Sequence, residues 1–466
     1  MGLITLGLAA LLSVAVATED DRRLTAEQAR EEVELVYDHV TTSHPDPFWW
    51  VAEPQWQARR DALLQREGPV TQVAQYFALA SLMSLATDTH VQIYPDESTP
   101  GFETTYPLRF RVFEDGLYIT AADDPYRHLV GHRIETIGGA PVADVLDTIA
   151  QYAFIDNDLR KRSWAAAHLL IAPATYRHHG WATADGRVEL ETVAPSGERL
   201  LNRLDSTIDQ SSWDVQESGY SEGYHWPVGW LTLDDLSGHE TLLSRSRLDE
   251  NYWYTDLDDG RIVYFQFNTS SDQDGGETFA QFTMTMFNDL MNREHAPERL
   301  IIDVRQNLGG WIGRSLAVSY LAQISEFCCQ RGSVVMLIGR ETISAGSVFA
   351  GVNEVATRSI AIGEPTGGRP NIFIGHEGFE LPYSQLNPEV SAYLYIGTDT
   401  ADRRHFVAPD ISVPERFSDV MAGRDMALER AMSLTQEEAE SFYQNLDSLR
   451  PWERASQQVA TLPRDE

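Results

Sequence analysis

The pattern of apolar and polar residues first predicts helices. In residues 25–43 apolar side chains recur at the spacing of one helical face, and Thr25 with Gln28 gives the pattern of a capping box. A second helix is predicted over 70–86. Together these segments predict a small helical domain over residues 18–104, which would form a cap beside the rest of the protein.

The pattern then changes to short strands. Apolar residues alternate with polar ones, as at Leu108, Phe110 and Val112, and a Gly-Gly turn followed by an amphipathic helix comes after them. This pattern predicts a compact α+β module over residues 105–201. Residues 202–255 are mostly polar with scattered aromatic side chains, and we expect a linker or an irregular insertion there.

The last large region alternates between apolar runs and helical segments. The expected elements are strands at 262–267, 300–304, 333–338 and 360–362, and helices at 279–291, 314–328 and 345–356. Strands that alternate with helices imply βαβ crossovers and a largely parallel or mixed sheet. We therefore expect an α/β domain over residues 256–435, followed by an acidic tail over 436–466.

Composition narrows the classes of partner. The chain has 466 residues, too many for one ordinary core, and its formal net charge is -34. A field of that sign repels nucleic acids and anionic membrane surfaces, so neither is expected as a partner. Residues 1–17 form an apolar run that ends in a small-x-small pattern at Ala17, which is typical of a secretory signal peptide. We expect an exported protein, periplasmic or secreted, with no membrane span in the mature chain.

Two segments carry the chemistry that the sequence offers. Residues 303–310 and 342–347 each follow an apolar strand and open a helix, so both are expected at one edge of the sheet. Ser344 there is either a nucleophile or simply a helix cap, since serine is a preferred cap. Backbone N–H groups of Gly309, Gly310 and Ala345 are the candidates for an oxyanion hole.

Several motifs resemble those of one peptidase family, in the same order along the chain. DVRQNLGG at 303–310 resembles the DLRxNxGG element of the S41 peptidases, the tail-specific or C-terminal processing proteases, and ISAGSVFA at 343–350 is similar to their nucleophile segment. The matching shorter elements are GEPTGG at 363–368, APDI at 408–411, GRD at 423–425, HPDPF at 44–48 and DTH at 88–90.

The resemblance implies a fold, a substrate and a site. It implies a ClpP/crotonase-like α/β catalytic domain with an N-terminal helical domain and a degenerate PDZ-like module, acting on polypeptides without a cofactor or a metal. The module would bind a substrate near its C-terminus by strand addition.

One departure from the family decides which mechanism to expect. Many relatives pair the serine with a lysine 25 positions later, and that position is Arg369 here, while Lys161 is the only lysine of the chain. Arginine stays protonated and cannot act as a base. The resemblance to a second branch of the family then makes His90 the general base, with Asp402 as the orienting carboxylate and Asp399 as the second choice.

The sequence therefore predicts an exported serine endopeptidase and leaves two alternatives open. One is an inactive protein of the same fold that binds a lipophilic or peptide ligand, because Arg369 would fit the loss of a dyad. The other is an esterase or amidase for small molecules, although no G-x-S-x-G motif supports it. The physiological substrate, the cleavage preference and the oligomeric state do not follow from the residues.

Overall fold

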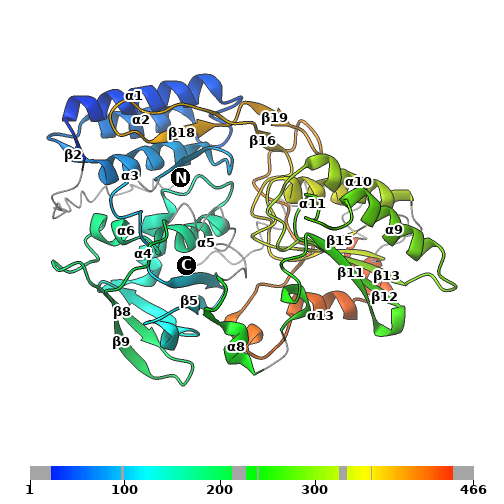
Figure 1. Cartoon of the computed structure of the whole chain (residues 1–466). Helices are drawn as coiled ribbons and strands as arrows, with labels where there is room; N and C mark the ends of the chain where they lie inside the picture. The colour runs from blue at the N-terminus through cyan, green and yellow to red at the C-terminus, as the bar shows by residue number, and fades with distance from the viewer. Residues whose placement is uncertain are drawn as a thin grey trace.

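The computed structural model (Figure 1) describes residues 22–95, 99–211, 227–238, 241–324, 333–357 and 359–443. The predicted signal peptide over 1–17 lies outside the described residues, as does most of the predicted tail. In the described part of the chain, no helix combines the length and the apolar character that crossing a membrane requires. Within the same ranges, no group of three or more His, Cys, Asp or Glu side chains is placed to hold a metal ion.

The N-terminal unit contains three helices, α1 (Ala26–Ser43), α2 (Glu53–Leu64) and α3 (Gln72–Met83). The predicted capping box is confirmed, because the Gln28 N–H donates to Oγ1 of Thr25 and the Thr25 N–H donates to Oε1 of Gln28. The sequence did not predict α2. Only Trp56 and Leu63 of α2 are buried, too few apolar positions to give a helical period.

The second unit is an antiparallel sheet with helices packed beside it. Its strands are β4 (Leu108–Phe113), β5 (Gly116–Ala122), β6 (Arg133–Ile137), β7 (Ala140–Pro141), β8 (Val188–Val193), β9 (Arg199–Leu204) and β10 (Leu231–Thr232). Its helices are α4 (Val142–Ala150), α5 (Asp158–Leu169) and α6 (Pro173–His178). The predicted boundary at residue 201 falls inside β9. The PDZ-like character of this unit stays a prediction.

The third unit is built on a mixed six-stranded sheet of order β11-β12-β13-β14-β15-β20. Its strands are β11 (Tyr252–Leu257), β12 (Ile262–Phe267), β13 (Arg299–Asp303), β14 (Val334–Ile338), β15 (Ile360–Gly363) and β20 (Ile411–Ser412). Only the β11–β12 pair is antiparallel. The predicted α/β sheet is thereby confirmed.

Helices cover both faces of this sheet, which explains why its strands are apolar without alternation. One face packs against α9 (Phe279–Met291), α10 (Ile312–Ile324) and α11 (Ala345–Ala356), and the other against α13 (Met426–Ser433). Figure 1 shows the three helices together on one side of the strands and α13 on the opposite side. Burial on both faces contributes the hydrophobic free energy that holds this unit together.

One segment of the third unit crosses to the first. Residues 371–395, here called the arm, begin with β16 (Ile372–Ile374), which pairs with β19 (Tyr393–Tyr395). Farther along the arm, β18 (Asn387–Val390) pairs with β3 (Gln92–Tyr94), and in Figure 1 it lies beside α1 and α2. The arm therefore fixes the N-terminal unit against the large sheet. It does so at β3, which directly follows the loop that contains His90.

Candidate active site

Ser344 lies between β14 and α11 in a strained backbone conformation. Its φ is +50° and its ψ is -124°, a region that residues with a side chain rarely adopt. Its hydroxyl makes no capping hydrogen bond to the helix that follows. The alternative that this serine serves merely as a helix cap is therefore wrong. A sharp strand-to-helix turn of this kind exposes a nucleophile at the sheet edge, here with Thr342 in place of the first glycine of a G-x-S-x-G motif.

His90 meets Ser344 across 254 positions of the sequence. The Nε2 atom of the imidazole lies 3.1 Å from Oγ of Ser344, at hydrogen-bond distance. When the ring proton is on Nδ1, the Ser344 hydroxyl donates to Nε2, the arrangement that a general base needs. The structure thus brings together the two residues that the sequence had paired only through a family resemblance.

The carboxylate beside His90 is Asp88, which was not the predicted one. Its Oδ1 lies 3.6 Å from Nδ1 of His90 and accepts a hydrogen bond from the His90 backbone N–H at 3.0 Å. Its Oδ2 accepts hydrogen bonds from Nε2 of His44 at 3.1 Å and from the Ser391 hydroxyl at 2.6 Å. Burial alone would raise its pKa, but these contacts with His44 and His90 hold the pKa of the Asp88 carboxyl well below its usual range.

The prediction that Asp402 or Asp399 orients the imidazole is corrected. The carboxylate of Asp402 is buried and accepts hydrogen bonds from the Arg404 guanidinium at 2.9 and 3.0 Å and from the Thr398 hydroxyl at 2.8 Å. Asp399 accepts from the backbone N–H of Ala401 at 2.8 Å. Both carboxylates therefore serve the loop they stand in. The sequence signal for Asp88 was its place two residues before His90 in the DTH element.

The two glycine-containing turns lie against one another, as predicted. The Ile343 N–H donates to the backbone carbonyl of Asn307 at 3.0 Å. Gly309 has a φ of +113°, and a Cβ atom there would stand 2.6 Å from Cβ and 3.0 Å from Oγ of Ser344. Only glycine allows this approach of backbone to the serine.

The oxyanion-hole prediction is corrected at one position. The Gly309 N–H donates to Oδ1 of Asn307 at 2.9 Å, so it is already engaged. The N–H groups of Gly310 and Ala345 have no hydrogen-bond acceptor among the described residues. Ala345 is the first residue of α11, where the helix dipole adds positive potential. The available donors are therefore Ala345 and Gly310.

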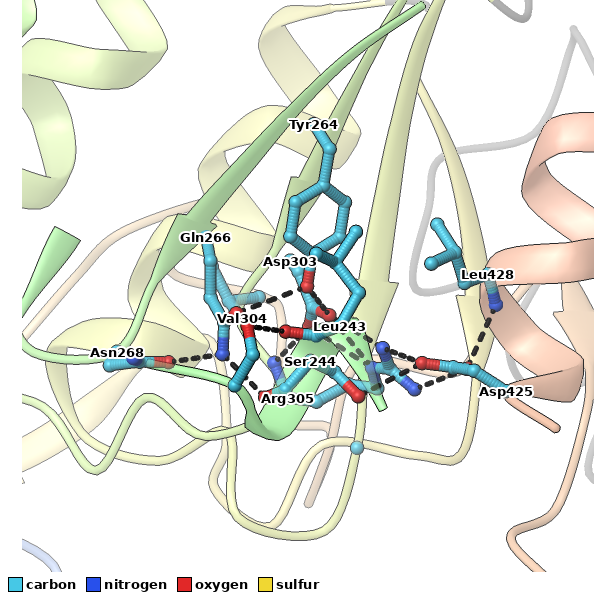
Figure 2. A network of polar contacts seen from close by, with 12 residues as sticks. Leu243, Ser244, Tyr264, Gln266, Asn268, Asp303, Val304, Arg305, Asp425 and Leu428 are labelled. Carbon is cyan, nitrogen blue, oxygen red and sulfur yellow. Dashed lines mark hydrogen bonds and ion pairs between the residues drawn. The ribbon is translucent and has the colours of Figure 1, made fainter. Parts of the chain in front are cut away.

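A polar network behind the sheet edge holds the 303–310 turn in place (Figure 2). Arg305 donates to Asp425 through two nitrogens, both at 2.8 Å, and also bonds Asp303. Tyr264 donates to Oδ2 of Asp303 at 2.7 Å, and the Ser244 hydroxyl donates to Asp425 at 2.9 Å. Although burial alone would raise it, the pKa of Asp425 is held below its usual value by Arg305. The DVR and GRD elements thus form one ion-paired cluster.

Comparison with known proteins adds the fold. No family model matches the chain, and no curated protein sequence matches it. Among solved structures, a mutant of CPAF superposes with a TM-score of 0.60 at 14% identity, covering 91% of this chain and 99% of that one. Mature CPAF gives 0.58 at 13% identity, with the same two coverages. The chain has the S41 peptidase fold.

The superpositions establish the S41 fold, but at 13–14% identity they do not settle the chemistry. The site therefore has to be judged on its own atoms. The residue at the usual lysine position and the one lysine of the chain both have other partners. Arg369 is buried and contacts Thr87 and Asp156. Lys161 lies on α5, where its amine is 3.7 Å from Asp158. The basic side chain at hydrogen-bond distance from the Ser344 hydroxyl is that of His90.

Proposed function

We propose that this protein is a serine endopeptidase that hydrolyses polypeptides through an acyl-enzyme on Ser344. The observation that carries the proposal is the 3.1 Å contact between Nε2 of His90 and Oγ of a strained Ser344. The S41 fold supports it, because the turns after β13 and β14 carry the free backbone donors and the nucleophile, and the N-terminal unit brings the imidazole of His90 to them.

In this mechanism His90 removes the proton of Ser344 as the oxygen attacks the scissile carbonyl. The N–H groups of Ala345 and Gly310 bind the oxygen that becomes negative. Asp88 stabilises the imidazolium that forms and keeps the ring proton on Nδ1. His90 then returns the proton to the leaving amine, and water attacks the acyl-enzyme by the same route in reverse.

The surface beside the nucleophile fits a polypeptide. Leu308 and Trp311, which flank Gly309 and Gly310, are 36% and 72% exposed. They provide apolar surface for substrate side chains beside the nucleophile. The net charge of -34 favours neutral or cationic segments as substrates.

Active-site labelling tests the proposal. A fluorophosphonate probe should label the wild type, while Ser344→Ala and His90→Ala should lose labelling and casein hydrolysis by at least about 10³-fold. His376→Ala is the matched control, because the His376 ring centroid lies 6.1 Å from that of His90 while its Nδ1 lies 3.4 Å from Glu389. It should retain both activities, and a loss in this variant equal to that of His90→Ala would mean that the wrong histidine has been assigned.

The same experiment separates the alternatives. If the fluorophosphonate labels neither the wild type nor any variant, a ligand-binding protein of this fold is favoured. If wild type cleaves p-nitrophenyl esters but leaves casein intact, the protein is an esterase. The backbone strain at Ser344 would be expected in either enzyme.

Export is the remaining part of the proposal. It rests on the apolar run and the small-x-small pattern of residues 1–17. N-terminal sequencing of the protein recovered outside the cytoplasm should give a chain that begins after Ala17. Recovery of the uncut chain from the cytoplasm alone would contradict it.

A further inference from the structure

Arg369 stands where many relatives have a catalytic lysine, yet its guanidinium is turned toward the loop that contains His90. Its side chain is 1% exposed, and one of its terminal nitrogens donates to the backbone carbonyl of Thr87. Its Nε lies 2.8 Å from Oδ1 of Asp156, an ion pair that lacks the alignment of a hydrogen bond. The central carbon of the guanidinium lies over the Phe373 ring, 5.4 Å from its centroid.

Asp156 connects Arg369 to Thr89, the residue that follows Asp88 in the sequence. Its Oδ2 accepts a hydrogen bond from the Thr89 hydroxyl at 2.8 Å. Arg369 therefore holds Thr87 directly and Thr89 through Asp156, and these are the two residues that flank Asp88. His90 follows at once. One guanidinium thus fixes the three residues that aim the imidazole at Ser344.

The backbone at this point needs such support. Thr87 has a φ of +46° and a ψ of 48°, a left-handed conformation that a β-branched residue seldom adopts. Its carbonyl faces the interior, where a group without a partner would be costly. The guanidinium provides a charged donor for that carbonyl and so stabilises the turn.

The positive charge of Arg369 is the second reason to connect this residue with His90. Asp88 and Asp156 are both buried carboxylates, and both lie close enough to His90 to interact with its charge. Burial raises the pKa of Asp156, and the positive charge of Arg369 opposes that rise. Arg369 thereby neutralises the second carboxylate and leaves Asp88 as the one that acts on the ring. Two different nitrogens of the guanidinium face Thr87 and Asp156, whereas a lysine would have to reach both from one nitrogen.

We propose that Arg369 is a positioning residue that sets the geometry of His90 for proton transfer with Ser344. This role rests on the proposed function, because it concerns the same site. It assigns a task to a position that in the lysine-dependent relatives supplies the base itself.

The test is the rate of fluorophosphonate labelling in the full-length protein, resolved into the binding constant KI and the inactivation rate constant kinact. In Arg369→Met we expect kinact to fall at least about 10-fold while KI stays within about twofold, since only the aim of the base changes. Arg109→Met is the matched control, because Arg109 is also 1% exposed and lies in β4, away from the His90 loop. It should keep the kinact of the wild type.

Rescue separates positioning from a loss of folding. Guanidinium ion at about 50 mM should restore kinact of Arg369→Ala at least about threefold and leave His90→Ala unchanged. If Arg369→Met does not fold, Thr89→Val serves instead. This substitution preserves shape, removes the hydroxyl that Asp156 holds, and should also lower kinact with little change in KI.

The outcomes distinguish the two proposals. Failure of the wild type to label refutes the proposed function. A wild type that labels while Arg369→Met and Thr89→Val retain the kinact of Arg109→Met overturns the role of Arg369 and leaves the proposed function standing. A change in KI alone, or no rescue by guanidinium, also counts against the positioning role of Arg369.

Discussion

Oδ1 of Asp88 lies 3.6 Å from Nδ1 of His90, on the opposite edge of the ring from Ser344. This distance suits an ion pair and is longer than a hydrogen bond, as often occurs before a substrate closes the site. We expect Asp88→Asn to lower kcat/KM for casein by at least about 100-fold, because the amide favours the wrong tautomer and cannot stabilise the imidazolium. Steady-state kinetics on the folded variant measures this.

Asp402→Asn should affect stability and not catalysis, in contrast to Asp88→Asn. It removes a buried partner of Arg404 and should lower the free energy of unfolding by about 1–3 kcal/mol. The casein kcat/KM of the folded protein should change less than about threefold. Urea unfolding and kinetics on the same preparation give both quantities. The reverse result, with Asp402→Asn inactive and Asp88→Asn active, would restore the prediction made from the sequence.

His44 should act through Asp88. Its Nδ1 accepts the Asp46 N–H at 3.1 Å, which leaves Nε2 to donate to Asp88. His44→Phe removes that donor, and we expect kcat to fall about 10-fold with KM nearly unchanged. His44→Gln retains an N–H donor and should recover most of the loss. Equal activity in the two variants would show that the donor is unimportant.

Gly309→Ala should remove labelling of Ser344. The added Cβ would stand 2.6 Å from Cβ of the serine, and the φ of +113° would be strained for alanine. We expect a loss of at least about 10²-fold in labelling rate, together with a lower midpoint of thermal unfolding. Gly313→Ala is the control, because its Cβ would meet nothing within 4 Å. That variant should label normally and be as stable as the wild type or more so.

The protein should lose stability in mild acid through two histidines of the N-terminal half. Burial lowers the pKa of His178 to about 3 and of His179 to about 4, against an ordinary value of 6.5. The unfolded chain therefore takes up these protons first, so stability is complete above about pH 6.5 and falls toward pH 4.

Linkage gives the size of that effect as about 2 kcal/mol per histidine at pH 5. His178 stacks on Phe77 and His179 on Trp181, so the double variant His178→Phe/His179→Phe retains the ring contacts. Its free energy of unfolding should change less than half as much between pH 7 and pH 5 as that of the wild type. Urea denaturation at the two pH values measures the difference, and parallel losses would contradict the assignment.

Much of the large sheet could be predicted from local pattern. β12, α9 and α11 have the bounds that the apolar runs indicated, because burial on both faces leaves a continuous apolar strand between helices of 3.6-residue period. The helix α5 was missed, since its charged start at 158–162 has no run of apolar residues at helical spacing. Farther along, Trp164 and the alanines after it are buried.

By itself the sequence determined the four central strands of the sheet, the candidate nucleophile Ser344 and, through Arg369, the exclusion of a lysine base. Only the tertiary structure decided that His90 reaches Ser344 and that Asp88, not Asp402, stands behind the imidazole. It also decided that the Asn307 side chain accepts the hydrogen bond of the Gly309 N–H. The physical reason is that these contacts depend on how separate units pack. With 70 acidic residues in the chain, spacing cannot tell which carboxylate folding will bury beside a ring.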